Sequence, residues 1–219
     1  MTESCLAEQI ISAGSDADRL RLLLSAANDP AGRLSDEIRE LCISSWSSDP
    51  SRVQRSASAL RCIYKAHRTD DVLANLKWTD GIAAITRGRF ENAVERLEVA
   101  ISVFLNLGRD TEAARVKVSK LLALAMLSRY DEALDTGLAA IPVLVDSGDQ
   151  LAAGKIEMNL SNIVSRRGKH ADAEGYCASA RRRFIVAGEP SWQAMAENGL
   201  ANTYAELNDF DRAARFYKA

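Results

Sequence analysis

A fixed period of 40 residues constrains the fold of this chain more than any other feature of its sequence. Four short turn-like segments, GRFENA, SRYDEA, GKHADA and NDFDRA, each carry a ring, at Phe90, Tyr130, His170 and Phe210. The same step separates a set of alanines and a set of glycines: Ala93, Ala133, Ala173 and Ala213; Gly108, Gly148 and Gly188. Three independent markers with one spacing indicate an internal structural repeat.

Each period contains two helical patterns. In the first full repeat we expect one helix over residues 71–87 and a second over 90–107, joined by a tight turn at the G-R-F junction, because glycine tolerates the left-handed conformation at a helix end. Gly108 would end the second helix, and Asp110 or Thr111 would cap the next one. Helices of this length, about 17 residues, are roughly 25 Å long.

The first 70 residues keep the period only weakly. Pro50 lies 40 residues before the first ring, and Asp49 as N-cap with Pro50 at the first helical position predicts a helix start. Residues 33–48 would form its partner helix, and residues 3–28 would add one or two capping helices. A terminal repeat needs a polar outer face, which explains its degeneracy. The predicted domains are an N-terminal helical cap with a degenerate repeat, 1–70, and a repeat array, 71–219, with repeats at about 71–110, 111–150, 151–190 and 191–219, the last one truncated.

The composition fits a folded helical protein. Hydrophobic residues make up 47% of the 219 residues and charged residues 26%, with only 4 prolines, and the abundant Ala, Leu, Arg and Glu favour helix. A net charge of −2 and a pI near 5.8 give no broad attraction to nucleic acid or anionic membranes. No apolar run approaches the roughly 20 residues that span a bilayer, and the N-terminus lacks the features of a signal peptide. We therefore expect a cytoplasmic protein without a membrane partner.

The repeated turns resemble those of the tetratricopeptide repeat (TPR) family. The matching features are the G-x-aromatic-x-x-A turns and the small residues Gly81, Ser161 and Ala201 in the first helices. Leu121 occupies that site in the second repeat, which implies a looser or shifted crossing of its two helices. The period of 40, against the usual 34, resembles the long-helix subgroup. The resemblance covers residues 70–219 and implies an all-α fold, a right-handed superhelix (solenoid) of antiparallel helix pairs.

In the TPR family the first helix of each repeat lines the concave surface. Asparagine is a poor helix former, yet polar residues including two asparagines form one stripe of the segment KIEMNLSNIVSR, residues 155–166. An asparagine amide both donates and accepts, so it can pair with a peptide backbone. The candidate groove residues are Asn75, Trp78, Arg115, Ser119, Lys155, Asn159, Asn162, Arg166, Asn198 and Asn202. An alternative stays open, in which Asn159 and Asn162 bond to neighbouring backbone or cap contacts between repeats.

Nothing in the sequence indicates an enzyme. His67 and His170 are the only histidines, and His170 occupies a ring position where a packing role is expected. No nucleophile signature, phosphate-binding loop or metal-ligand spacing is present, so no cofactor and no metal is predicted. The triplet Arg181 to Arg183 is read as part of a solvated convex face. The four cysteines, Cys5, Cys42, Cys62 and Cys177, are expected to be reduced and buried.

We therefore expect a noncatalytic scaffold for protein–protein interaction, which binds a peptide or partner segment in the concave groove; Lys155, Arg166 and Arg115 favour an acidic partner. The alternative is a regulatory region of a larger multidomain enzyme, because the segments NLSNIVSRRGKHADAEGY and ENGLANTYAELNDFDRAARFY also resemble TPR arrays of bacterial proteins with a C-terminal, caspase-like CHAT peptidase domain. An RNA-contacting helical array is a third, less favoured hypothesis. The last helix ends at Ala219, before its period is complete, which predicts a fragment of a longer protein or a homodimer formed through that uncapped end.

Overall fold

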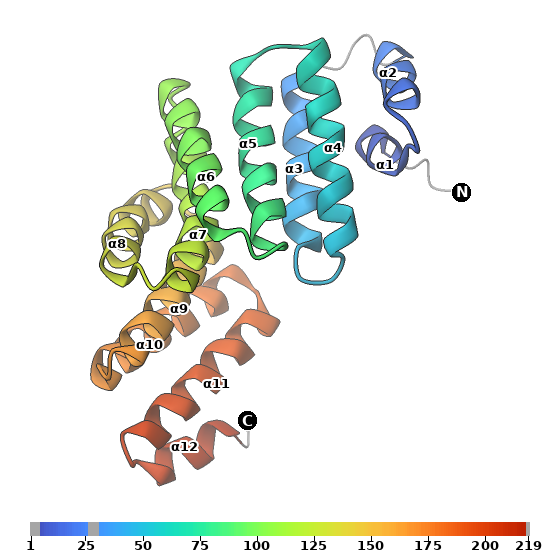
Figure 1. The fold of residues 1–219 in the computed structure, drawn as a ribbon. Coiled ribbons are helices and arrows are strands. Elements are labelled where there is room, and N and C mark those ends of the chain that lie inside the picture. The colour runs from blue at the N-terminus through green and yellow to red at the C-terminus, as the bar shows by residue number, and fades with distance from the viewer. Residues whose placement is uncertain (1–4, 26–30, 218–219) are drawn as a thin grey trace. The chain divides into compact units, whose positions relative to one another are not determined.

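The computed structural model describes residues 5–25 and 31–217, and all regular structure in these ranges is α-helical (Figure 1). The all-α class and the antiparallel pairing of helices are confirmed. The twelve helices of the described ranges are α1 (Leu6–Ser12), α2 (Asp16–Ser25), α3 (Ala31–Ser45), α4 (Pro50–Ala66), α5 (Asp70–Ile85), α6 (Phe90–Asn106), α7 (Asp110–Met126), α8 (Tyr130–Asp146), α9 (Gln150–Arg166), α10 (His170–Ala187), α11 (Pro190–Glu206) and α12 (Phe210–Tyr217).

Contacts divide the chain into two compact units, Met1–Val116 and Lys117–Ala219, and each is described by itself. In the first unit, apolar side chains of α1, α3, α4 and α5 form one buried cluster around Ile38, Leu60 and Ile63. In the second unit, α9, α10, α11 and α12 bury a cluster around Phe184 and Leu200. The domain boundary expected at residue 70 stays a prediction.

The turns within the repeats follow one backbone pattern. Gly88 has φ of 69°, and the next residue donates its amide to the carbonyl of Ala84, so α5 ends in a left-handed turn. Ser128 takes the same position in the next repeat with φ of 59° and Asn208 does so in the fourth, also with 59°. The tight turn predicted at the G-R-F junction is confirmed.

The start of α4 also follows its prediction. The Asp49 carboxylate accepts a hydrogen bond from the Arg52 amide at 2.9 Å, with Pro50 as the first residue of α4. Helices α1 and α2 lie in the segment expected to form capping helices, and α3 packs against α4; the capping role stays a prediction. Within the described ranges, no helix has both the length and the apolar character required to cross a membrane.

Candidate functional site

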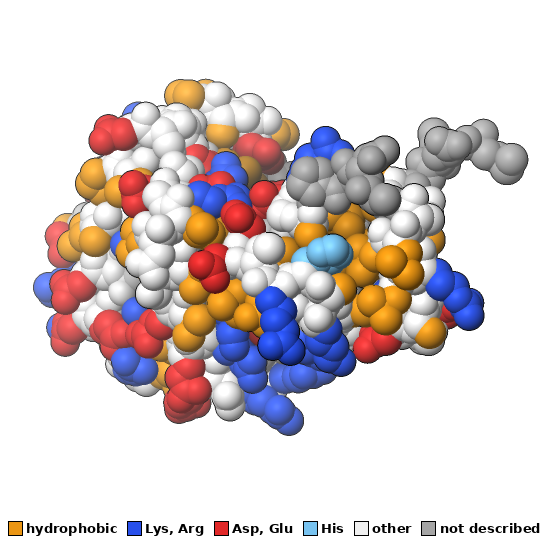
Figure 2. Space-filling view, turned by 90° about the horizontal axis from the view of Figure 1, so that it is seen from above, with side chains coloured by type: hydrophobic (Ala, Val, Ile, Leu, Met, Phe, Trp, Pro, Cys, Tyr) orange, Lys and Arg blue, Asp and Glu red, His pale blue; other side chains and the backbone are white. Residues whose placement is uncertain are grey.

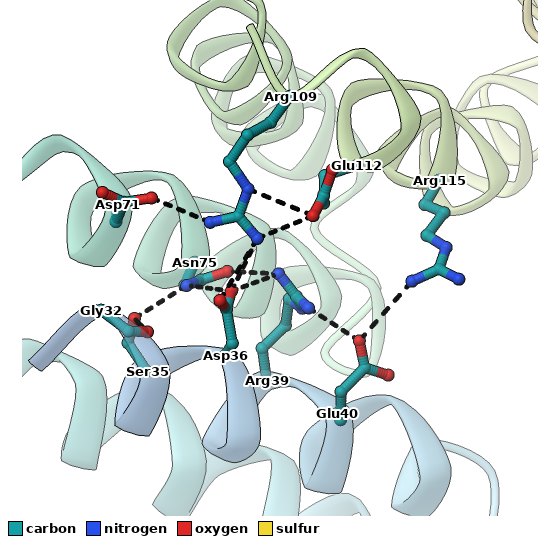
Figure 3. A network of polar contacts seen from close by, with 10 residues as sticks. All are labelled: Gly32, Ser35, Asp36, Arg39, Glu40, Asp71, Asn75, Arg109, Glu112 and Arg115. Carbon is teal, nitrogen blue, oxygen red and sulfur yellow. Dashed lines mark hydrogen bonds and ion pairs between the residues drawn. The ribbon is translucent and has the colours of Figure 1, made fainter. Parts of the chain in front are cut away.

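Asn75, a predicted groove residue, lies fully inside the first unit. Its Nδ2 donates to Ser35 Oγ at 2.8 Å and to Asp36 Oδ1 at 2.9 Å, while its Oδ1 accepts from Arg39 Nη1 at 2.7 Å. The side chain is 0% exposed. Both ends of the amide are thus bound by α3, and none of its surface is open to a partner (Figure 3).

Trp78 is also buried, at 3% exposure. Its ring packs edge-on against Phe104, with 6.1 Å between the centroids. The guanidinium of Arg39 lies 5.1 Å from the centroid of the Trp78 ring, a cation–π contact in a desolvated position. Trp78 and Arg39 thus fill the side of the first unit that α3 and α5 share, which we call the first-helix side.

Arg109 closes this side of the first unit (Figure 3). It lies in the turn between α6 and α7, and its guanidinium donates to Asp71 at 2.8 Å, to both Asp36 oxygens at 3.1 and 3.2 Å, and to Glu112 at 2.7 and 3.1 Å. The same group stands 5.1 Å from the centroid of Phe104. Three carboxylates from three helices therefore hold one arginine.

The electrostatics of Arg109 follow from this geometry. Burial lowers the pKa of Arg109, but its hydrogen bonds to Glu112, Asp36 and Asp71 outweigh burial, so the pKa lies above its ordinary value. For Glu112, burial raises the pKa while the Arg109 bond lowers it, and the net shift is downward. Sequence reasoning missed Arg109 because its partner Asp36 lies 73 residues away, outside any local pattern.

Two further predicted residues belong to α7. Arg115 lies in the first unit, where its guanidinium stands 4.0 Å from the carboxylate of Glu40 in α3. Ser119 lies in the second unit and is buried, at 3% exposure. Arg115 is thus near an acidic side chain and Ser119 is buried, so neither presents an unengaged polar group to a binding partner.

In the second unit, α9 and α11 lie side by side. The Lys155 ammonium stands 4.6 Å from the ring centroid of Trp192, and that ring packs against Phe184 at 5.7 Å. Farther along, Met158 Cε is 3.5 Å from the place where a Cβ on Gly199 would lie. These contacts join the two helices into the first-helix side of the second unit. Sequence reasoning missed Trp192.

The paired asparagines belong to α9 and α11 of the second unit. Asn162, Asn198 and Asn202 are exposed and Asn159 is half-buried. Asn202 accepts a hydrogen bond from the Tyr217 hydroxyl at 2.6 Å, whereas the side chains of Asn159, Asn162 and Asn198 bond to no group in residues 5–25 and 31–217. The amides of Asn159, Asn162 and Asn198 are therefore unengaged within these ranges, in contrast to that of Asn75.

Charged and apolar groups flank these amides. Arg166 is exposed at the end of α9, where hydrogen bonding by Ser128 and then by Arg166 lowers the pKa of the Tyr130 phenol. Met195 in α11 is 52% exposed. Figure 2 shows one face of the molecule, on which both acidic and basic side chains are exposed.

The described residues contain no group of three or more side chains placed to hold a metal ion. Cys42, Cys62 and Cys177 are buried, as predicted, but the prediction is wrong for Cys5, which is exposed just before α1. Burial raises the pKa of Cys42 to about 12, although a hydrogen bond with Thr79 acts in the opposite direction.

The comparisons with known proteins agree on repeats of this type. No family model matches the sequence. Over 106 residues the chain is 31% identical to the protein kinesin light chain-related 3 of Arabidopsis thaliana, a match that covers 48% of this chain and 16% of that protein. The chain thus spans about one sixth of the length of this relative.

Two solved structures share the fold. The structure of BtubC (BKLC) from P. vanneervenii aligns with a TM-score of 0.75 at 18% identity, covering 99% of this chain and 89% of that one. The Rap protein complexed with Competence and Sporulation Factor aligns with a TM-score of 0.69 at 13% identity, covering 97% and 61%. With its helix pairs and its glycine-marked turns, the chain has a TPR-like helical repeat fold.

Proposed function

We propose that this chain is a noncatalytic scaffold that binds a peptide or partner segment on the first-helix side of its second unit. The observation that carries the proposal is the set of amides of Asn159, Asn162 and Asn198, which no described residue engages. Unengaged amides can pair with the backbone of an extended segment whatever its side chains are. Asn75, whose amide is fully used inside the first unit, is left out of the proposed surface, and so is Trp78.

Two further features of this surface indicate the chemistry of the partner segment that it would bind. Lys155 and Arg166 lie at the two ends of the α9 stripe, so carboxylates of the segment would meet a positive charge at either end. The exposed Met195 of α11 offers a flexible apolar contact. The proposed partner is therefore an acidic segment with at least one apolar side chain. In the Rap complex, a protein of similar fold binds Competence and Sporulation Factor, which supports this kind of use.

The experiment uses fluorescent 12-residue peptides of graded net charge, with binding read by fluorescence anisotropy. The parent should bind acidic peptides most tightly, and Asn159→Ala with Asn162→Ala should weaken binding by about tenfold, since each lost hydrogen bond is worth roughly 0.5–1.5 kcal/mol. The melting temperature should stay nearly unchanged. Asn106→Ala, which removes an exposed asparagine at the end of α6, is the matched control. Equal binding by the double variant and the control would refute the proposal, as would binding to no peptide.

The alternative role, a regulatory region of a larger multidomain enzyme, rests on one observation. The matching segment of kinesin light chain-related 3 is 16% of that protein, so repeats of this kind occur within longer chains. A CHAT-type peptidase domain stays a prediction, which the sequence of the full-length gene product tests directly. Sedimentation of the purified chain tests the predicted homodimer.

A further inference from the structure

Arg109 connects helices that are far apart in the sequence. From the turn before α7 its guanidinium reaches Asp36 in α3, Asp71 in α5 and Glu112 in α7 itself (Figure 3). Charge-assisted bonds of this kind are roughly twice as strong as neutral ones. Because a single side chain makes all of them, its release would remove these polar links among α3, α5 and α7 at the same moment, while α3 and α5 keep their shared apolar core.

Asp36 connects Arg109 to buried residues of α3 and α5. Asp36 Oδ1, which binds Arg109, also accepts from Asn75 Nδ2 at 2.9 Å and from Arg39 Nη1 at 2.8 Å. Arg39 in turn covers the ring of Trp78. The position of Arg109 is thereby coupled to the burial of two predicted groove residues, Asn75 and Trp78.

Arg109 nevertheless stays within reach of solvent. Its side chain is 23% exposed, and those of its partners Asp36 and Asp71 are 31% and 42% exposed. Dissolved salt screens ion pairs that are partly exposed. We propose that Arg109 is a latch: its bonds hold the first-helix side of the first unit closed, and their release opens that side and brings Asn75 and Trp78 to the surface.

The latch bears on the proposed function in one respect. While it is closed, Asn75 and Trp78 are out of a partner's reach, and binding is confined to the second unit. This consequence rests on the proposed function, whereas the latch itself does not. Measurements of opening without any peptide therefore test the latch separately from partner binding.

The test compares amide hydrogen exchange in the parent, Arg109→Met and Arg129→Met. Arg129 is the matched control, because it also precedes a helix and pairs with a glutamate three residues on, Glu132, but reaches no other acid among the residues that the structure describes. Exchange in α3 and α5 reports their local opening. We expect it to be about tenfold faster in Arg109→Met at low salt and unchanged in Arg129→Met. Equal exchange in all three proteins would overturn the latch.

Salt and fluorescence separate a latch from ordinary stabilisation. As NaCl is raised from 0.05 to 1 M, the amide exchange rate in α3 of the parent should rise toward the rate in Arg109→Met. The rate in Arg109→Met should not change with salt. In a Trp46→Phe, Trp192→Phe background, acrylamide should quench Trp78 more strongly once Arg109 is replaced. Arg109→Lys keeps the charge without the planar fork; it should lie between parent and Met variant, and it replaces Arg109→Met if that variant does not fold. A uniform rise across all helices of the first unit, with no salt response in the parent, would refute the latch.

Discussion

Leu121 packs against Gly137, which reverses the arrangement of the preceding repeat at the same two positions. Leu121 Cδ2 lies 3.1 Å from the place where a Cβ on Gly137 would be. Forty residues earlier Gly81 is the small partner, and Leu97 Cδ2 lies 2.6 Å from its missing Cβ. Each crossing thus combines one large and one absent side chain. Gly137 supplies the room for Leu121. The prediction of a looser or shifted crossing rests on Leu121 considered without this glycine.

Replacing Gly137 with alanine should destabilise the protein by about 1–3 kcal/mol, the usual cost of overpacking a close-packed core. Besides Leu121, the new methyl group would meet Leu160 Cδ2 at 2.7 Å and Ile156 Cγ2 at 3.2 Å. Urea unfolding followed by circular dichroism measures the change. Gly175→Ala is the control, because a Cβ there meets nothing within 4 Å and alanine favours helix by roughly 0.5–1 kcal/mol. Equal stability of the two variants would contradict this account of the crossing.

Asn75→Ala should lower the stability of the first unit by about 1–3 kcal/mol, because it removes a buried acceptor of Arg39 and a buried donor to Ser35 and Asp36. Asn162→Ala, at an exposed position, should change stability by no more than about 0.5 kcal/mol. Thermal unfolding of the two variants in the same buffer measures both. If the two substitutions had equal effects, the distinction between the engaged and the unengaged asparagine would be wrong.

These two asparagines show what the sequence predicts and what it does not. The 40-residue period and the caps predict the helices and turns well, since they depend on residues that are neighbours in the chain, such as Asp49 and Arg52. The surroundings of an amide on a first helix depend instead on the helix of the preceding repeat. Asn75 meets Ser35 and its neighbours in α3, whereas Asn162 meets no such group. The repeat period assigns both asparagines to the groove. Only the residues of the neighbouring helix distinguish the engaged Asn75 from the unengaged Asn162.

The same reason explains why Arg109 was not predicted. Its place before α7 corresponds to that of Asp149 before α9, which acts as an ordinary cap by accepting from the Ala152 amide at 3.0 Å. The local sequence around Arg109 indicates only its neighbour Glu112, three residues on. The role of Arg109 arises from acids on α3 and α5, which only the folded chain brings together. Long-range polar contacts are therefore the part of this site that a single sequence leaves open.

Among the cysteines, one thiol should react rapidly in the native protein. Cys5 is exposed, whereas burial raises the pKa values of Cys42, Cys62 and Cys177 and thus keeps them as unreactive thiols near neutral pH. Titration with a chromogenic disulfide reagent at pH 7.5 should show one fast equivalent, and four after denaturation. Cys5→Ser should remove the fast equivalent. A second fast thiol in the native state would contradict the burial of the other three.

The Glu112 carboxylate should contribute stability that acid removes. Its folded pKa is below the ordinary 4.5: burial acts to raise it, but the bond to Arg109 favours the charged form and outweighs burial. The contribution is therefore fully present above about pH 4.5 and is lost as the pH falls through the folded pKa. Glu112→Gln should be less stable than the parent at pH 7, by about 1–2 kcal/mol, and the difference should shrink toward pH 3. Urea unfolding across this range measures it, with the exposed Glu95→Gln as control. A difference that stays constant from pH 7 to pH 3 would mean that the Arg109 bond does not depend on the charge of Glu112.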